Sequence, residues 1–215
     1  MKQAAQEGDI DLYFLDESGF APTLPMTSTW AREGVRAIVR AEAPERRRVN
    51  AIGAVAPYGD QQRLAWRTTT DKVDSAMFLR FLWRDVAQMR GPVGRVRYDY
   101  QRARPCVIVL DNYSVHHSAV VKKMLPSLRF AGIVLFYLPP YSPELNPIEG
   151  IWRQIKHAGM SQRSFTTEQD LQRAVETALT DYAQILAIRP GRHDPERLPY
   201  PTDTTPSANY LPKAA

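Results

Sequence analysis

The chain has 215 residues, of which 44% are hydrophobic and 24% are charged. This balance is typical of a folded globular domain, and it excludes a mainly disordered chain, a collagen-like chain and a disulfide scaffold. The single cysteine, Cys106, rules out an internal disulfide and fits a reducing compartment. No apolar run is long enough to span a membrane, and residues 1–9 lack the apolar segment of a signal peptide. The net charge of +5 favours a polyanionic partner.

The first third of the chain predicts strands in close succession. An apolar run at residues 10–15 ends at Asp16, and the following Glu17-Ser18-Gly19 predicts a turn after a buried strand. Short β-rich runs at residues 35–39, 49–56 and 64–70 predict further strands. Because turns separate these runs, we expect an antiparallel meander.

Helices and strands then alternate. Residues 74–90 place apolar side chains on one helical face, with Asp74 or Ser75 as the cap. Apolar runs at residues 106–110 and 133–138 predict buried parallel strands, joined by a helix that begins near Ser118 and is kinked or ended early by Pro126. Asn146-Pro147 predicts another helix start, with Asn146 as the cap, and a last helix runs from about residue 167 to 188.

These elements predict one α/β domain. Its sheet is mixed, an antiparallel meander joined to parallel strands, with helices on both faces. We assign residues 1–9 to an N-terminal extension and residues 10–188 to the domain. Residues 189–215 carry six of the 17 prolines and no apolar periodicity, so we assign them to a proline-rich C-terminal tail.

Three acidic residues stand at the ends of predicted elements. Asp16 closes the first strand, Asp111 follows the strand at residues 106–110, and Glu149 lies in the first turn of a helix. If these two strands are neighbours, Asp16 and Asp111 lie side by side, and both stay ionised only if a cation neutralises them. A hard divalent ion such as Mg²⁺ suits such carboxylates, and two ions can catalyse phosphodiester cleavage.

Each acid also has a structural alternative. Asp16 and Asp111 can each begin a turn through their side chains, and Glu149 stands at the last position of a capping box. Glu17 and Glu144 are rival acids, although Glu17 is expected on the opposite strand face from Asp16. Spacing alone does not choose among these readings.

Longer motifs favour the catalytic interpretation of these acids. Residues 14–20 (FLDESGF), 110–118 (LDNYSVHHS) and 137–149 (YLPPYSPELNPIE) resemble the three signature blocks of the mariner-like DDE transposase superfamily, in particular its bacterial insertion-sequence branch. Residues 30–34 (WAREG) are similar to a further family segment, and the third block is the most specific. The resemblance covers about residues 10–160 and implies a ribonuclease-H-like fold, with Asp16, Asp111 and Glu149 as the catalytic and metal-binding acids.

The resemblance implies an enzyme that uses Mg²⁺ or Mn²⁺, two ions per site, to cleave DNA at transposon ends. The freed 3′-hydroxyls then attack target DNA, usually at a TA dinucleotide. Alternatives are an inactive or domesticated DNA-binding remnant and a ribonuclease-H-like nuclease without strand transfer. The implied partners are double-stranded DNA and further copies of the chain assembled on it, without a membrane. We expect a bacterial, cytoplasmic and nucleoid-associated protein.

Family members carry N-terminal helix-turn-helix modules, for which residues 1–9 leave no room. The chain is therefore expected to be the catalytic half of a transposase split over two reading frames, or a truncated or relic form. In the split form, the upstream product supplies recognition of the transposon ends.

Further polar residues complete the expected site. Asn112 and His116 match family positions beside the second acid and are expected to support it or contact the DNA backbone. His117 is expected to be a solvated residue at a helix start. Arg153 and Lys156 share the helical face of Glu149 and are expected to bind phosphates. A DNA track would add a loop in which Tyr98 and Tyr100 are interleaved with Arg90, Arg95, Arg97, Arg102 and Arg104. Arg46, Arg47 and Arg48 either extend this track or form an ordinary solvated face.

Overall fold

The computed structural model of the chain describes residues 1–23, 32–34, 48–59, 62–89, 93, 102–140, 142–160 and 164–188. Several predictions fall outside these residues: the strand at 35–39, the proline-rich tail at 189–215, and the DNA-track residues Arg46, Arg47, Arg90, Arg95, Arg97, Tyr98 and Tyr100.

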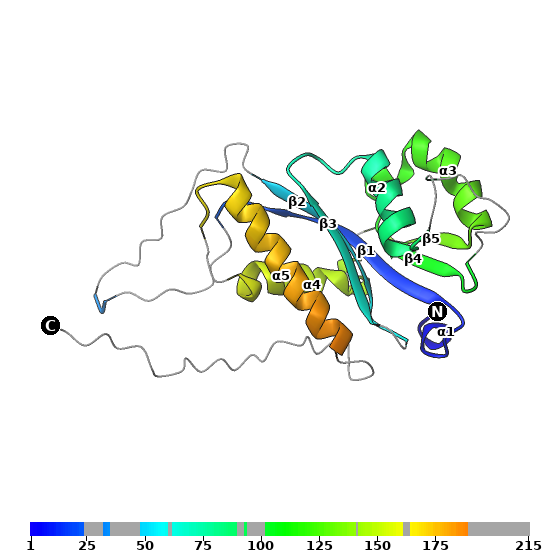
Figure 1. Cartoon of the computed structure of the whole chain (residues 1–215), viewed down its shortest axis with the longest axis horizontal. Helices are drawn as coiled ribbons and strands as arrows, with labels where there is room; N and C mark the ends of the chain where they lie inside the picture. Colours follow the sequence, from blue (N-terminus) through cyan, green and yellow to red (C-terminus); the bar gives the residue numbers. More distant parts are fainter. Residues whose placement is uncertain are drawn as a thin grey trace.

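A five-stranded sheet forms the centre of the described structure, in the order β3-β2-β1-β4-β5. The strands are β1 (Asp11–Phe20), β2 (Val49–Ala56), β3 (Arg63–Thr69), β4 (Cys106–Leu110) and β5 (Ile133–Tyr137). β1, β2 and β3 pair antiparallel, whereas β4 lies parallel to both β1 and β5. The predicted mixed sheet is therefore confirmed (Figure 1).

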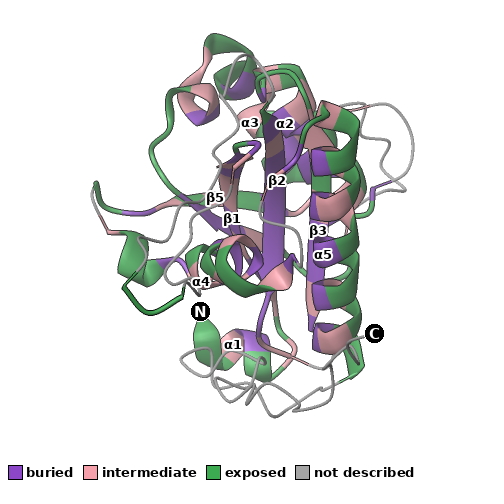
Figure 2. Cartoon of the chain, turned by 90° about the vertical axis from the view of Figure 1, so that its left-hand side faces the viewer, coloured by how far each residue is buried: buried purple, intermediate pink, exposed green. Residues whose placement is uncertain are grey.

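Helices cover both faces of this sheet, as predicted (Figures 1 and 2). α2 (Ser75–Phe81), its π-helical continuation (Leu82–Val86) and α3 (Ala119–Phe130) pack on the face that presents Leu15, Ile52 and Ile108. On the other face, α4 (Ile148–Gln154), a π-helical turn (Ile155–Gly159) and α5 (Glu168–Ile188) cover Val49, Val55 and Leu64. The short α1 (Lys2–Gln6) precedes β1. No helix in the described part of the chain has the length and apolar character needed to cross a membrane.

β1 is longer than predicted. Residues 16–19, which we expected to form a turn, continue the strand, because they pair with β2 from Asp16 opposite Gly53 to Gly19 opposite Asn50. The pairing with β2 satisfies backbone hydrogen bonds that a turn would have to satisfy locally. Asp16 therefore lies inside a strand, on a rigid backbone.

Two predictions about the second half are also wrong. Of the two effects predicted for Pro126, a kink or an early end, the early end is wrong: α3 runs on to Phe130, because the buried Val121 and Leu128 on its inner face pack into the core and offset the lost hydrogen bond. β5 is not fully buried, since Val134 and Phe136 are 39% and 45% exposed. Among the described strands β5 pairs with β4 alone, so it forms an edge.

Candidate active site

Asp16 and Asp111 come from neighbouring parallel strands. β1 and β4 pair from Asp11 opposite Cys106 to Phe14 opposite Val109, and Asp111 directly follows the end of β4 at Leu110. The side chains of Asp16 and Asp111 border a cavity of about 440 Å³, together with Glu149 from the first turn of α4. The three acids singled out in the sequence thus face one space.

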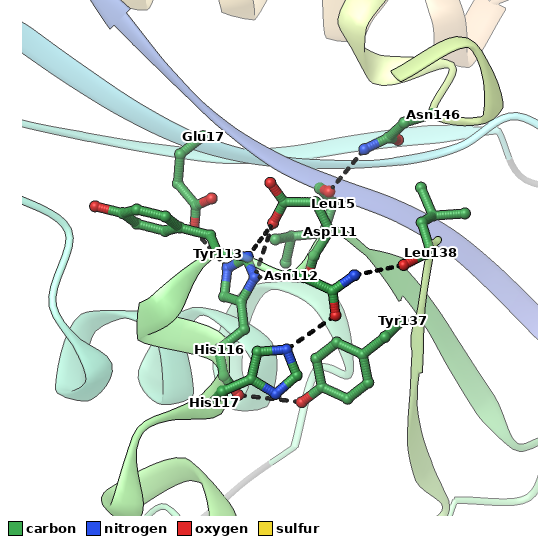
Figure 3. A network of polar contacts seen from close by, with 10 residues as sticks. All are labelled: Leu15, Glu17, Asp111, Asn112, Tyr113, His116, His117, Tyr137, Leu138 and Asn146. Atoms are coloured by element: carbon green, nitrogen blue, oxygen red, sulfur yellow. Dashed lines mark hydrogen bonds and ion pairs between the residues drawn. The ribbon is translucent and has the colours of Figure 1, made fainter. Parts of the chain in front are cut away.

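The capping alternative for Glu149 does not hold. α4 begins at Ile148 with Pro147 as its cap and no capping side chain. The Asn146 side chain instead donates from Nδ2 to the Leu15 carbonyl oxygen at 3.0 Å, which ties the loop to β1 (Figure 3). The Asn146 backbone N–H donates to the Pro143 carbonyl oxygen, so it is not available to Glu149 for a capping box. The prediction that Asn146 caps the helix was therefore wrong, and Glu149 is left exposed at the cavity.

Asp16 lies deep in the site. Its Oδ2 accepts a hydrogen bond of 3.0 Å from the indole Nε1 of Trp152 on α4. Burial, followed by the neighbouring carboxylates of Glu149 and Glu17, raises the pKa of Asp16 to about 8. The ionised form of Asp16 is therefore destabilised unless a positive charge lies close to it.

Asp111 has the opposite surroundings. Its side chain is 53% exposed, and its Oδ1 lies 3.1 Å from Nδ1 of His116. The backbone N–H of Tyr113 also donates to Oδ1, at 3.0 Å. The hydrogen bond from His116 holds the pKa of Asp111 below its usual range, so this carboxylate is ionised at neutral pH.

His116 links Asp111 to the opposite face of β1. Its ring is fully buried, with Nε2 3.0 Å from Oε1 of Glu17 (Figure 3). Both ring nitrogens face acceptors, and only the imidazolium can donate from both. Burial lowers the pKa of His116, but the hydrogen bonds to Asp111 and Glu17 outweigh it and raise the pKa to about 9. Glu17 points away from the face of Asp16, as predicted, and serves here as the partner of His116.

Asn112 and His117 fix the loop after β4. Nδ2 of Asn112 donates to the Leu138 carbonyl oxygen at 2.6 Å, and its Oδ1 lies 3.0 Å from Nε2 of His117. The His117 ring stacks on Tyr137 with their centroids 4.4 Å apart. The expectation of a merely solvated His117 was wrong, because the aromatic side chain of β5 provides a surface for its ring.

The basic residues divide between two places. Lys156 extends from the same helical segment as Glu149, with Nζ 5.3 Å from the centre of the Phe20 ring. Burial and the nearby Arg48 lower its pKa, while Glu149 and Asp16 oppose that shift. Arg153 is exposed on the same segment.

Arg102 and Arg104 do not join the acids. Both pair with Asp11 at the start of β1, and they line a separate cavity of about 510 Å³. Arg102 also donates to the carbonyl oxygens of Ala87 and Arg104. Their guanidinium groups therefore bind parts of the chain itself, which the expected DNA track did not anticipate.

The donor set of the cavity suits a hard divalent cation. It offers three carboxylates and the amide oxygen of Asn146, which is buried and has no hydrogen-bond partner in the described structure. The pKa of Asp16 is raised first by burial and then by the nearby carboxylates, and a bound cation would oppose both effects. Within the described ranges, no group of three or more His, Cys, Asp and Glu side chains is arranged to hold a metal ion. One oxygen of Asp16 and one of Asp111 accept hydrogen bonds from Trp152 and His116 instead.

Sequence reasoning missed two members of this site. Trp152 is 2% exposed, as its apolar spacing with Ile148 and Ile151 on α4 indicates, but such spacing does not reveal the acceptor of the indole N–H. Sequence reasoning treated Glu17 only as a rival acid. The signal that could have found Glu17 is strand alternation, which directs Glu17 to the face on which His116 lies.

Comparisons with known proteins agree with this geometry. A family model described as DDE superfamily endonuclease matches residues 11–172. Among solved structures, the chain is similar to one described as a pre-cleavage Mos1 transpososome, with 12% identity and a TM-score of 0.55 over 83% of this chain and 51% of that chain. It is also similar to the mariner Mos1 paired-end complex with Mg, with 14% identity and a TM-score of 0.50 over 82% of this chain and 50% of that chain. Identities this low show a shared fold.

A curated relative is the uncharacterized protein y4pE/y4sA of Sinorhizobium fredii (strain NBRC 101917 / NGR234). It is 35% identical over 65 residues, which are 30% of this chain and 44% of the relative. The chain thus spans about half the length of the proteins that it matches.

Proposed function

Since the chain belongs to the DDE superfamily endonuclease family, whose model matches residues 11–172, we propose that it is the catalytic domain of a transposase. Membership of this family implies dependence on a divalent metal ion. The proposed reaction is cleavage of double-stranded DNA at transposon ends, followed by attack of the freed 3′-hydroxyls on target DNA. The observation that carries the proposal is that Asp16 of β1, Asp111 at the end of the neighbouring β4, and Glu149 of α4 line the same cavity.

In this proposal Asp16, Asp111 and Glu149 hold Mg²⁺ or Mn²⁺, two ions per site. When bound, such ions activate the attacking oxygen and stabilise the leaving oxygen of a phosphodiester. His116 orients Asp111 by a hydrogen bond to one of its carboxylate oxygens. Lys156 and Arg153, which extend from the helical segment of Glu149, contact phosphates of the cleaved strand.

The proposed partners are double-stranded DNA, further copies of this chain assembled on it, and an upstream helix-turn-helix product that recognises the transposon ends. The net charge of +5 favours such a polyanionic partner. A bacterial, cytoplasmic and nucleoid-associated location is part of the same proposal.

The test incubates the chain with Mg²⁺ or Mn²⁺, a supercoiled plasmid containing TA sites and candidate end DNA, with and without the upstream product. We expect nicking and strand transfer by the wild-type chain. Asp111→Asn should retain DNA binding and lose nicking, whereas Glu144→Gln, a control acid in the loop before α4, should nick as the wild type does.

Each outcome separates the proposal from its rivals. Nicking by Asp111→Asn at the wild-type rate would refute the site assignment. Hydrolysis without strand transfer would point to a ribonuclease-H-like nuclease. Salt-sensitive DNA binding with no nicking at any concentration of either metal would point to a DNA-binding remnant.

A further inference from the structure

Asp16 shares its sheet face with a glycine on β2, the neighbouring strand, and with a tryptophan on β3, the strand beyond it. The strand register sets Asp16 of β1 opposite Gly53 of β2, and Gly53 opposite Trp66 of β3. Directly paired residues project to the same face of a sheet, and Trp66 packs in the cluster beneath α4 and α5. Gly53 therefore leaves a gap between two side chains on the face that α4 covers.

The ring of Trp152 fills this gap. A Cβ atom built on Gly53 would lie 2.7 Å from Cη2 and 2.8 Å from Cζ2 of Trp152, and 3.1 Å from Cδ1 of Ile148. Real carbon contacts are longer, so any side chain at position 53 would displace the ring. The absence of a side chain at Gly53 thus sets how far Trp152 reaches over the sheet.

At that depth the indole reaches Asp16. Nε1–H of Trp152 can only donate, and its acceptor is Oδ2 of Asp16 at 3.0 Å. A hydrogen bond to one oxygen fixes the rotation of the carboxylate, while Oδ1 is not used in this bond. Trp152 follows Glu149 by one helical turn on α4, so the same helix supplies one acid of the site and a donor to another.

We propose that Trp152 is a positioning residue for Asp16, acting through its indole N–H from a place that Gly53 keeps open. The inference rests on the proposed function for its consequence, which is that Asp16 is oriented to bind the divalent ion. Groups that orient metal ligands typically contribute 10- to 100-fold to metal affinity.

The first test examines the contact itself, without metal or DNA. In the ¹⁵N-labelled full chain, the four tryptophans give four indole N–H resonances, and the one that is lost in Trp152→Phe belongs to Trp152. We expect this resonance to move upfield in Asp16→Ala, which removes its acceptor, and to stay in place in Asp111→Ala. A Trp152 resonance that does not respond to Asp16→Ala would overturn the inference.

The second test examines the consequence by calorimetric titration with Mn²⁺ alone. Trp152→Phe keeps an aromatic ring and removes the donor, so we expect Mn²⁺ affinity to fall about 10-fold or more. Trp66→Phe, which removes an indole from the same cluster but leaves Trp152 in place, should bind Mn²⁺ as the wild type does. Gly53→Ala should reproduce the loss seen in Trp152→Phe.

Equal Mn²⁺ affinities for Trp152→Phe and Trp66→Phe would overturn the inference. A failure of the proposed function is a different result, namely a wild-type chain that cleaves no DNA. The resonance and titration results would still decide the role of Trp152 in that case, because neither uses DNA.

Discussion

Asp16 lies in β1 and Asp111 at the end of the neighbouring parallel strand β4, yet the two sides of the cavity surround them in opposite ways. Asp16 is half-buried, accepts a hydrogen bond from the neutral indole of Trp152, and has a pKa raised to about 8. Asp111 is half exposed, faces the imidazolium of His116, and has a lowered pKa. The imidazolium of His116 thus offsets part of the charge of Asp111, since it also serves Glu17, whereas the indole that donates to Asp16 is uncharged.

The difference follows from the layers behind each strand. Beneath the Asp111 side, α2 contributes Phe78, whose ring lies 4.6 Å from that of His116, and β1 contributes Glu17. Beneath the Asp16 side, α4 contributes the indole of Trp152. A cation bound in the cavity would therefore face Asp16, Glu149 and an Asp111 whose charge is only partly compensated, because one imidazolium serves two carboxylates.

The largest expected effect on stability comes from removing the positive charge of His116. His116→Ala leaves Glu17, whose side chain is 15% exposed, without its partner. We expect a loss of about 3–5 kcal/mol in the free energy of unfolding, measured by urea denaturation. His117→Ala, its neighbour on the surface, should cost about 1 kcal/mol or less. Equal losses for the two variants would show that the buried His116–Glu17 pair contributes no more to stability than His117 does.

Removing the negative charge of Asp16, on the other side of the cavity, should stabilise the folded chain. Because the pKa of Asp16 is raised to about 8 in the folded chain, the wild type loses stability as the pH rises from about 4 to 8. Asp16→Asn keeps an oxygen for Trp152 and carries no charge. Without divalent ions at pH 9, we expect it to raise stability by about 2 kcal/mol, or roughly 5 °C in Tm.

The gain in Asp16→Asn should vanish at pH 4, where the wild-type Asp16 is protonated in the folded chain. Differential scanning calorimetry between pH 4 and pH 9 measures both ends. A variant less stable than the wild type at pH 9 would contradict the raised pKa of Asp16.

Asp111→Asn should have a smaller effect of the opposite sign. The lowered pKa of Asp111 means that its ionised form stabilises the fold above pH 4, and that this contribution is lost as the pH falls below it. Because the carboxylate is half exposed, we expect a loss of only about 1 kcal/mol at pH 7. The same calorimetric series measures it, and stabilisation by Asp111→Asn would remove the contrast between the two aspartates.

The smallest expected effect concerns DNA binding on the Asp16 side. Arg153 is exposed, whereas Lys156 is half-buried against Phe20 with a lowered pKa. Arg153→Ala should therefore weaken binding to double-stranded DNA by about 0.5 kcal/mol, roughly twofold in Kd, and reduce the salt dependence by about one phosphate contact. Lys156→Ala should change both quantities less. Fluorescence anisotropy over a salt series measures them, and the reverse order would contradict this prediction.

Periodicity alone was enough for most of the fold. The apolar runs placed β2 at Val49–Ala56 and β4 at Cys106–Leu110, and the 3.6-residue period identified the buried face of α5 from Leu171 to Leu186. These elements are predictable because each one buries a face that its own sequence marks. β1 and α3 were misjudged where pairing with β2 and packing of Leu128 overrode the local signals of Gly19 and Pro126.

The acids of the candidate site could be identified from motifs, but their burial, pKa shifts and hydrogen-bond partners could not. Asp16, Asp111 and Glu149 look alike in sequence, as carboxylates at the ends of predicted elements. The pairing of β1 with β4 brings the first two to one cavity, and the hydrogen bond from the Asn146 backbone N–H to Pro143 leaves Glu149 out of a capping box.

The sequence by itself thus determined which elements form, their apolar faces and the three acids. The tertiary structure decided that Trp152, 136 residues from Asp16, donates to it, and that Glu17 and Asp111, 94 residues apart, share His116. The physical reason is that hydrophobic periodicity is local along the chain. Burial, charge and hydrogen-bond partners depend on which distant segments the fold places side by side.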